Sequence, residues 1–108
     1  MARIIGETYK VIIDRPMGST HPDYPDIVYQ VNYGYIEGIM AADGEAQDAY
    51  VLGVDNTITE FEGKLIAIIH RLNDVENKWV ISNKEYSKEE IYSQVEFMEK
   101  YFKVEVLM

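Results

Sequence analysis

The sequence predicts an α+β fold that is mainly β: a small barrel of about five strands with one C-terminal helix packed against it. Runs rich in β-branched and aromatic residues recur up to residue 82, whereas a helical pattern occurs only after it. The chain has 108 residues, with neither an internal repeat nor a linker-like segment. We therefore expect one domain, residues 1–108, with a single hydrophobic core.

The first two strands are predicted on either side of an irregular segment. Residues 8–14 (TYKVIID) have the composition of a strand, and residues 15–26 contain all three prolines of the chain. Residues 27–36 (IVYQVNYGYI) again predict a strand. Its alternate positions share one face: Tyr29, Val31, Tyr33 and Tyr35.

Three further strands are predicted in the middle of the chain. The first covers residues 49–54 (AYVLGV), and residues 64–72 (KLIAIIHRL) form a nearly continuous apolar run that suits a strand covered on both sides. The acidic turn NDVEN then leads into residues 78–82 (KWVIS), which completes a hairpin. His70 lies in the apolar run and has no zinc-type spacing to His21, so we interpret it as a hydrogen-bonded structural residue.

One helix is predicted near the C-terminus. Ser87 followed by Glu90 forms a capping box, which makes Ser87 the N-cap. The apolar stripe that follows has helical spacing: Ile91, Val95, Met98 and Phe102. A short strand, VEVL, is expected after it.

The composition excludes several classes of partner. Ten Lys and Arg residues against nineteen Asp and Glu give a net charge of -9, which argues against nucleic acid because no basic stripe is available for phosphates. The absence of cysteine excludes disulfides and thiolate metal sites. No apolar run is long enough to span a bilayer, and no signal peptide is visible. We therefore expect no membrane partner and a cytoplasmic location.

Two acidic turns could bind a divalent cation. The first sets Asp43, Glu45 and Asp48 along six residues beside Gly44. Carboxylates are the ligands that Mg²⁺ prefers, although a turn of this kind is by itself more typical of a solvated surface. The second turn has Asp74 and Glu76 ahead of Lys78, a point charge for phosphate. The tyrosines of residues 27–36 either donate to anionic oxygens or pack on a half-buried face.

The order of these segments resembles the soluble, Mg²⁺-dependent (family I) inorganic pyrophosphatases. The resemblance covers residues 11–102, and its most specific parts are Asn-Tyr-Gly-Tyr at 32–35 and the Asp-Gly-x-x-x-Asp frame at 43–48. It implies a five-stranded barrel of OB type and a cytoplasmic enzyme that commonly forms homo-oligomers. It also implies hydrolysis of inorganic pyrophosphate, bound as its metal complex, to two orthophosphates by a metal-activated water. Mg²⁺, or Mn²⁺, is the implied cofactor.

The resemblance also assigns roles to individual residues. Glu45 takes the place of the carboxylate that orients the attacking water. The implied metal ligands are Asp43, Asp48, Asp74 and Glu76. The implied substrate-binding residues are Arg15, Tyr29, Tyr33, Lys78 and Tyr101.

The chain departs from the family pattern at several of these positions. Glu45 and Glu76 stand where the family has aspartate, and Phe102 stands where a lysine is expected, with Lys103 as a substitute. The N-terminal part is compressed, so that either Asp14 or Arg15 could enter the site. These departures leave two alternatives open: a binding or regulatory domain with little turnover, and a hydrolase of another phosphoanhydride.

Overall fold

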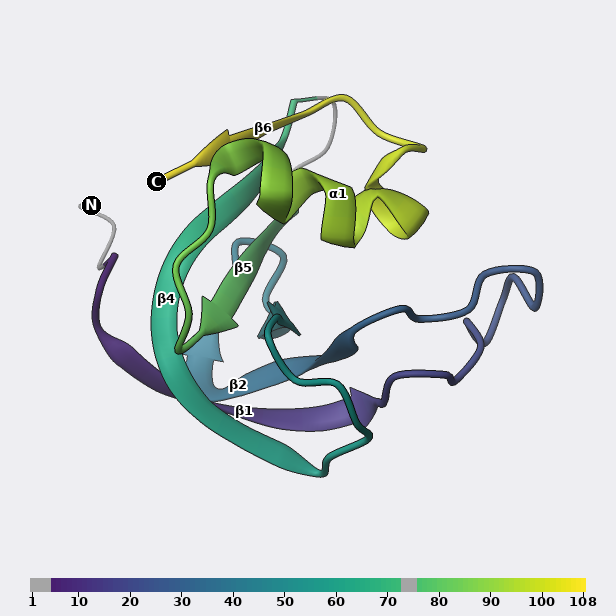
Figure 1. The fold of residues 1–108 in the computed structure, drawn as a ribbon, viewed down its shortest axis with the longest axis horizontal. Coiled ribbons are helices and arrows are strands. Elements are labelled where there is room, and N and C mark those ends of the chain that lie inside the picture. Colours follow the sequence, from purple (N-terminus) through teal and green to yellow (C-terminus); the bar gives the residue numbers. More distant parts are fainter. Residues whose placement is uncertain (1–4, 73–75) are drawn as a thin grey trace.

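Six strands and one helix make up the part of the chain that the computed structural model describes, residues 5–72 and 76–108. The elements follow one another as β1 (Thr8–Arg15), β2 (Asn32–Met40), β3 (Ala46–Val51), β4 (Glu60–Arg71), β5 (Asn77–Ser82), α1 (Lys88–Glu99) and β6 (Val104–Leu107). The predicted mainly β fold, a small five-stranded barrel with one C-terminal helix, is confirmed (Figure 1). Helix α1 is too short and too polar to cross a membrane, and the described residues contain no other helix.

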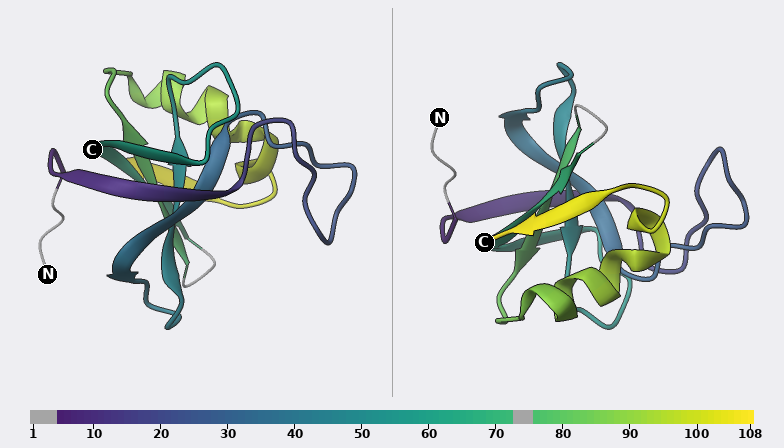
Figure 2. Two further views of the ribbon diagram at one scale, coloured as in Figure 1. Left: turned by 90° about the horizontal axis from the view of Figure 1, so that it is seen from below. Right: turned by 90° about the horizontal axis from the view of Figure 1, so that it is seen from above.

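The barrel closes because β4 pairs on both of its edges. The strands follow the order β1-β2-β3-β5-β4, and the first half of β4 pairs back with β1, Thr8 opposite Lys64. The second half of β4 pairs instead with β6, His70 opposite Glu105. Only β3 and β5 run parallel among these pairs of described strands. Figures 1 and 2 show β4 as a long curved strand that passes from the barrel to the C-terminal strand.

The strand predicted at residues 27–36 is wrong in its first half. β2 begins at Asn32, and residues 27–31 belong to the loop that precedes it. Their backbone pairs within that loop: the Tyr29 N–H donates to the Ser19 carbonyl at 2.8 Å, and the Gly18 N–H donates to the Tyr29 carbonyl at 2.8 Å. The apolar pattern therefore indicated correctly that Tyr29 and Val31 are buried. The backbone hydrogen bonds of Tyr29 are made within the loop and not within the sheet.

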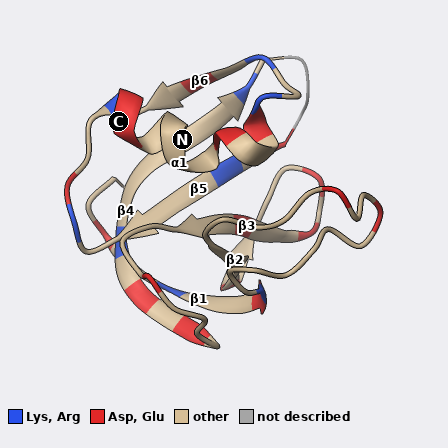
Figure 3. Cartoon of the chain, turned by 45° about the vertical axis from the view of Figure 1, so that its right-hand side comes forward, with Lys and Arg blue, Asp and Glu red and all other residues tan. Residues whose placement is uncertain are grey.

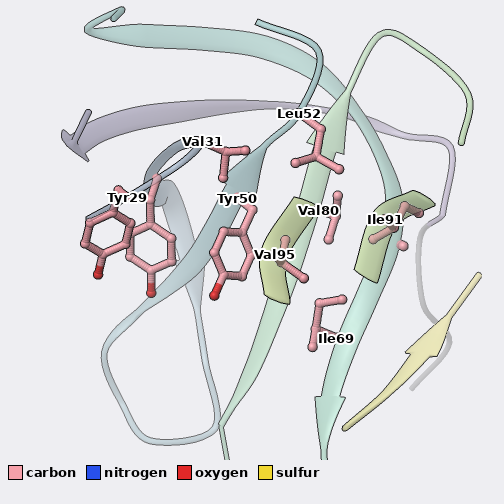
Figure 4. Close-up of a cluster of buried hydrophobic side chains, with 10 residues drawn as sticks. Tyr29, Val31, Tyr50, Leu52, Ile69, Val80, Ile91 and Val95 are labelled. Atoms are coloured by element: carbon pink, nitrogen blue, oxygen red, sulfur yellow. The ribbon is translucent and has the colours of Figure 1, made fainter. Parts of the chain in front are cut away.

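Two hydrophobic clusters lie on opposite faces of the barrel wall. Alternation along β3 separates them, since Ala49 and Val51 belong to one cluster and Tyr50 to the other. The first cluster takes its buried residues from the five barrel strands and fills the barrel interior. The second includes Ile91 and Val95 of α1, so it joins the helix to the outside of the wall (Figure 4).

Gly34 lies on β2 where the backbone of β1 leaves no room for a side chain. A Cβ atom at this position would lie 1.8 Å from the carbonyl oxygen of Ile12, which belongs to the backbone and cannot rotate away. Glycine is therefore required by the spacing of the two strands. This gives a physical reason for the glycine within Asn-Tyr-Gly-Tyr.

The predicted start of the helix is confirmed. The Ser87 side chain accepts a hydrogen bond from the Glu90 N–H, and the Ser87 N–H donates to the Glu90 carboxylate at 2.8 Å. Ile91 and Val95 are buried as the stripe predicts, whereas Phe102 lies beyond the last residue of α1. The strand expected at the C-terminus is β6.

Candidate functional site

A pocket of about 550 Å³ lies between the loop of residues 16–31, the C-terminal end of α1 and the barrel strands. Strands β2, β3, β4 and β5 supply its floor, and the loop and the residues after α1 supply its sides. The predicted site residues that line it are Arg15, Tyr29, Tyr33, Asp48, Glu76, Lys78 and Tyr101. The structure thus brings together residues that are widely separated in the sequence.

Lys78 is the centre of this arrangement. Its Nζ atom lies 2.7 Å from Asp48 Oδ2 and 3.1 Å from Glu76 Oε1, and it donates a hydrogen bond to the Tyr33 hydroxyl at 2.7 Å. Only 7% of the side chain is exposed. A buried ammonium group requires such partners, since its removal from water is otherwise very unfavourable.

Arg71 is held next to Lys78 by the end of the helix. Its Nε donates to Glu99 Oε1 at 3.0 Å and its Nη2 to Glu99 Oε2 at 2.8 Å, while Nη1 donates to Glu76 Oε1 at 3.3 Å. The Tyr50 hydroxyl donates to Glu99 Oε2 at 2.6 Å. The guanidinium also lies 3.7 Å from the centre of the Phe102 ring. Bidentate and stacked contacts of this kind fix an arginine in one orientation.

These contacts form a continuous chain of alternating charges: Glu99, Arg71, Glu76, Lys78 and Asp48. Figure 3 shows acidic and basic segments together where α1 passes over β5. Glu99 is completely buried near the C-terminus of α1, where the helix dipole disfavours negative charge. The Arg71 guanidinium compensates for both the burial and the dipole.

Three tyrosines of the pocket, Tyr29, Tyr33 and Tyr50, stay protonated at neutral pH. Burial, and then the nearby Asp48 carboxylate, raise the pKa of the Tyr33 phenol well above its usual value. Burial and then Glu99 do the same to the pKa of Tyr50. Burial also raises the pKa of Tyr29, although Arg15 acts in the opposite direction. The phenol oxygens of Tyr29 and Tyr50 point toward the same end of their cluster, away from Leu52 (Figure 4).

Arg15 rather than Asp14 lines the pocket. The pairing of β1 with β2 is irregular between Ile13 and Arg15, and Arg15 Nη1 donates to the Tyr29 hydroxyl at 3.3 Å. Asp14 is exposed, although partial burial of its carboxyl is the main cause of its raised pKa, which Arg15 opposes. Of the two neighbouring residues, Arg15 is therefore the one whose side chain lies at the pocket.

Asp43 and Glu45 lie away from the pocket. Both are exposed in the turn between β2 and β3, where the Glu45 N–H donates to Asp43 Oδ1 at 3.0 Å. Asp48 lies on β3, so the three carboxylates of the first acidic turn do not face one point. Within residues 5–72 and 76–108, three or more His, Asp or Glu side chains nowhere group closely enough to hold a metal ion. Asp74 lies outside the described residues.

Sequence reasoning missed several residues of the pocket, notably His21, Tyr24 and Arg71. Arg71 could have been found. Glu99 continues the buried helix positions Ile91 and Val95 at intervals of four, so a carboxylate occupies the apolar stripe. Such a residue requires a buried cation, and Arg71 ends the apolar strand β4. The loop residues have no comparable signal, because only the tertiary fold places them.

Comparison with known proteins supports the fold. No protein-family model matches the chain, and no curated protein matches it. An inorganic pyrophosphatase from Ehrlichia chaffeensis has a similar structure, with a TM-score of 0.70 and 15% identity over 96% of this chain and 86% of the other. One from Helicobacter pylori gives 0.64 and 16% over 97% and 88%. One from Thermus thermophilus gives 0.61 and 18% over 99% and 84%. The chain therefore has a pyrophosphatase-like fold.

Proposed function

We propose that the protein hydrolyses inorganic pyrophosphate to two orthophosphates in a reaction that requires a divalent cation. The observation that carries this proposal is the position of Lys78 between the carboxylates of Asp48 and Glu76, at the floor of the pocket. A cation flanked by two carboxylates and bonded to the Tyr33 phenol suits a phosphate bound together with a metal ion. The likeness of the fold to inorganic pyrophosphatases supports the same conclusion.

The donor set of the pocket fits Mg²⁺. This ion is usually bound by one or two carboxylates together with waters and substrate phosphates. Asp48 lies on β3 and Glu76 immediately precedes β5, and both already face one positive charge, the Lys78 ammonium. They are the residues that would hold the ion. When bound, Mg²⁺ neutralises phosphate charge and makes water more acidic.

The side chains of the pocket have complementary tasks in the reaction. A water oxygen forms a bond to one phosphorus atom, and the bridging P–O bond breaks, so that its electron pair leaves with the second phosphate. Lys78 and Arg15 donate to phosphate oxygens and stabilise the charge that grows on the leaving group. Tyr29 accepts a hydrogen bond from Arg15, which leaves its own O–H for the substrate. The water loses one proton, and the departing phosphate is the group that needs one.

A second function, binding of pyrophosphate with little turnover, is favoured by one observation. Asp43 and Glu45, which the resemblance makes a metal ligand and the water-orienting carboxylate, are exposed outside the pocket. A site without them keeps its phosphate-binding groups but has fewer groups to act on the water. Binding and turnover therefore have to be measured separately.

The test is release of phosphate from pyrophosphate by the purified chain, with Mg²⁺ or Mn²⁺ and with EDTA. We expect release only with the divalent cation. Lys78→Met should lower turnover by roughly 100-fold, the usual effect of removing one donor that stabilises the transition state. Asp55→Asn, an exposed carboxylate outside the pocket, is the matched control. Binding of pyrophosphate by calorimetry without phosphate release would establish the binding function instead.

A further inference from the structure

We propose that the preferred ligand of this pocket is a phosphoanhydride that carries a nucleobase, such as a nucleoside diphosphate, rather than pyrophosphate alone. The inference rests on the proposed function and specifies its substrate class. Three features lead to it: the size of the pocket, the rings that line the part away from Lys78, and the polar groups between those rings.

The pocket is larger than its phosphate-binding part requires. The groups that would bind a phosphate together with its metal ion are close together: Asp48 and Glu76 each lie within hydrogen-bond distance of the Lys78 Nζ atom. The whole pocket has a volume of about 550 Å³, within the range of roughly 300–1,000 Å³ that is typical for organic ligands of drug size. Pyrophosphate, with two phosphoryl groups and no organic part, occupies only a fraction of such a volume.

Aromatic rings line the rest of the pocket from two sides. On the loop of residues 16–31, the centres of the His21 and Tyr24 rings lie 5.1 Å apart, and the His21 ring is nearly parallel to the Tyr29 ring at 6.3 Å. After the end of α1, Tyr101 and Phe102 line the same pocket. Figures 1 and 2 show the loop and the end of α1 on the same side of the molecule. Two sets of rings that border one cavity suit a flat ring between them.

Two of these rings are largely exposed, which leaves their faces available for contact with a ligand. Tyr24 is 62% exposed and Tyr101 is 60% exposed, although both border the pocket. One face of Phe102 is already occupied, because the Arg71 guanidinium lies over it. An aromatic ligand that covers such rings binds favourably, because their apolar surface is then removed from water.

Polar groups in the same lining favour a nucleobase over a hydrocarbon chain as the organic part of the ligand. The Asp23 N–H donates to His21 Nδ1 at 3.0 Å, so the neutral ring carries its proton on Nε2, where it can serve as a donor. Asp26 adds a carboxylate acceptor to the same lining. Base edges combine donors and acceptors, whereas a hydrocarbon chain needs a deeper and drier pocket.

The test compares two kinds of non-hydrolysable ligand that share the same phosphate chemistry: methylenediphosphonate, and the α,β-methylene diphosphates of adenosine and uridine. Binding to the full chain is measured by calorimetry in Mg²⁺. We expect at least one nucleotide analogue to bind about tenfold or more tightly than methylenediphosphonate, since stacking of one base contributes roughly five- to hundredfold in affinity.

Substitutions of single tyrosines show which rings contact the base. Tyr24→Ala should weaken the nucleotide analogue about five- to hundredfold and leave methylenediphosphonate within about twofold. Tyr101→Ala should weaken the nucleotide analogue more than methylenediphosphonate. Tyr101→Phe should retain nucleotide affinity, because the ring and not the hydroxyl makes the contact. Tyr92→Ala, on α1 but outside the pocket lining, is the control.

Equal affinity for the two kinds of ligand, or equal weakening of both by the alanine variants, would overturn this inference and leave pyrophosphate binding intact. If neither ligand bound, the inference and the proposed function would fall together.

Discussion

Arg71, which lines the pocket, forms a bidentate ion pair with Glu99, with Nε–Oε1 and Nη2–Oε2 distances of 3.0 and 2.8 Å. The pair joins the end of β4 to the end of α1, and Tyr50 donates to it from β3. Burial lowers the pKa of the Arg71 guanidinium, but the hydrogen bond and attraction to Glu99 outweigh this effect and give a net rise. The helix end is thus attached to the barrel by charge as well as by the apolar packing of Phe97 and Met98.

Removal of one partner of this pair should be strongly destabilising. Glu99→Leu leaves a buried guanidinium without its main acceptor, and we expect the free energy of unfolding to fall by about 3–5 kcal/mol. The double variant Arg71→Met with Glu99→Leu removes both charges. It should lose less free energy of unfolding than the sum of the losses in the two single variants. Urea unfolding of the four proteins measures the coupling. Simple additivity would show that the pair does not act as a unit.

Gly34→Ala should separate β1 from β2. Its methyl group would overlap the carbonyl of Ile12, so the two strands have to move apart, and we expect a loss of about 3 kcal/mol or more in the free energy of unfolding. Glu37→Ala, at an exposed position of the same strand, should change it by less than about 0.5 kcal/mol. Thermal and urea unfolding give both values. A Gly34→Ala protein as stable as the wild type would contradict the close approach of the strands.

Asp14→Asn should stabilise the protein in a manner that depends on pH. Burial raises the pKa of this carboxyl in the folded state, so the folded protein binds its proton more tightly than the unfolded chain does. Ionisation therefore disfavours the folded state once the pH exceeds the unfolded pKa of about 3.9, and the full effect is reached above the folded pKa. Asparagine cannot ionise, so the variant should be more stable than the wild type at pH 7.

The gain from Asp14→Asn should shrink as the pH falls through the raised pKa and disappear below the unfolded value. Urea unfolding at pH 7, 5 and 4 measures this trend, with Asp55→Asn as the exposed control. A gain that is the same at every pH would show that a hydrogen bond of the amide, and not the charge, is responsible.

Asp48 and Glu45 should differ in their importance for turnover. Asp48 contacts Lys78 in the pocket, and we expect Asp48→Asn to lose most of the Mg²⁺-dependent release of phosphate and most of the rise in melting temperature with Mg²⁺. Glu45 is exposed in the turn between β2 and β3, so Glu45→Gln should retain turnover within about threefold. A deep loss in Glu45→Gln would show that this turn folds onto the pocket when substrate binds.

The local signals of the sequence predicted local structure well. The capping box at Ser87 involves residues three positions apart, so its outcome depends little on the rest of the chain. His70 was interpreted as a structural residue, and its Nδ1 atom does lie 2.8 Å from Asn77 Oδ1 on the paired strand. In both cases the partner is a near neighbour in sequence or in a hairpin.

Features that depend on distant partners were harder to predict. The segment around Tyr29 has a strand pattern, yet its backbone pairs with Ser19 in the loop, and no periodicity distinguishes these partners. Whether Glu45 faces the pocket depends on the direction in which the turn enters β3, and a pattern of charges in the sequence does not specify this direction. His21 and Tyr24 border the pocket only because their loop lies beside the end of α1.

The double pairing of β4 also has a consequence for how the chain folds. The ring closes only when Thr8 meets Lys64, and the chain between them contains two other strands, β2 and β3, and a long loop. Closure of so long a loop loses much chain entropy before its contacts are gained, so a slow folding step is expected here. Asp48 and Lys78 meet through a second non-local step, the pairing of β3 with β5. Ligand-binding competence should therefore develop in a refolding experiment together with these late steps, and not with the earlier formation of the helix.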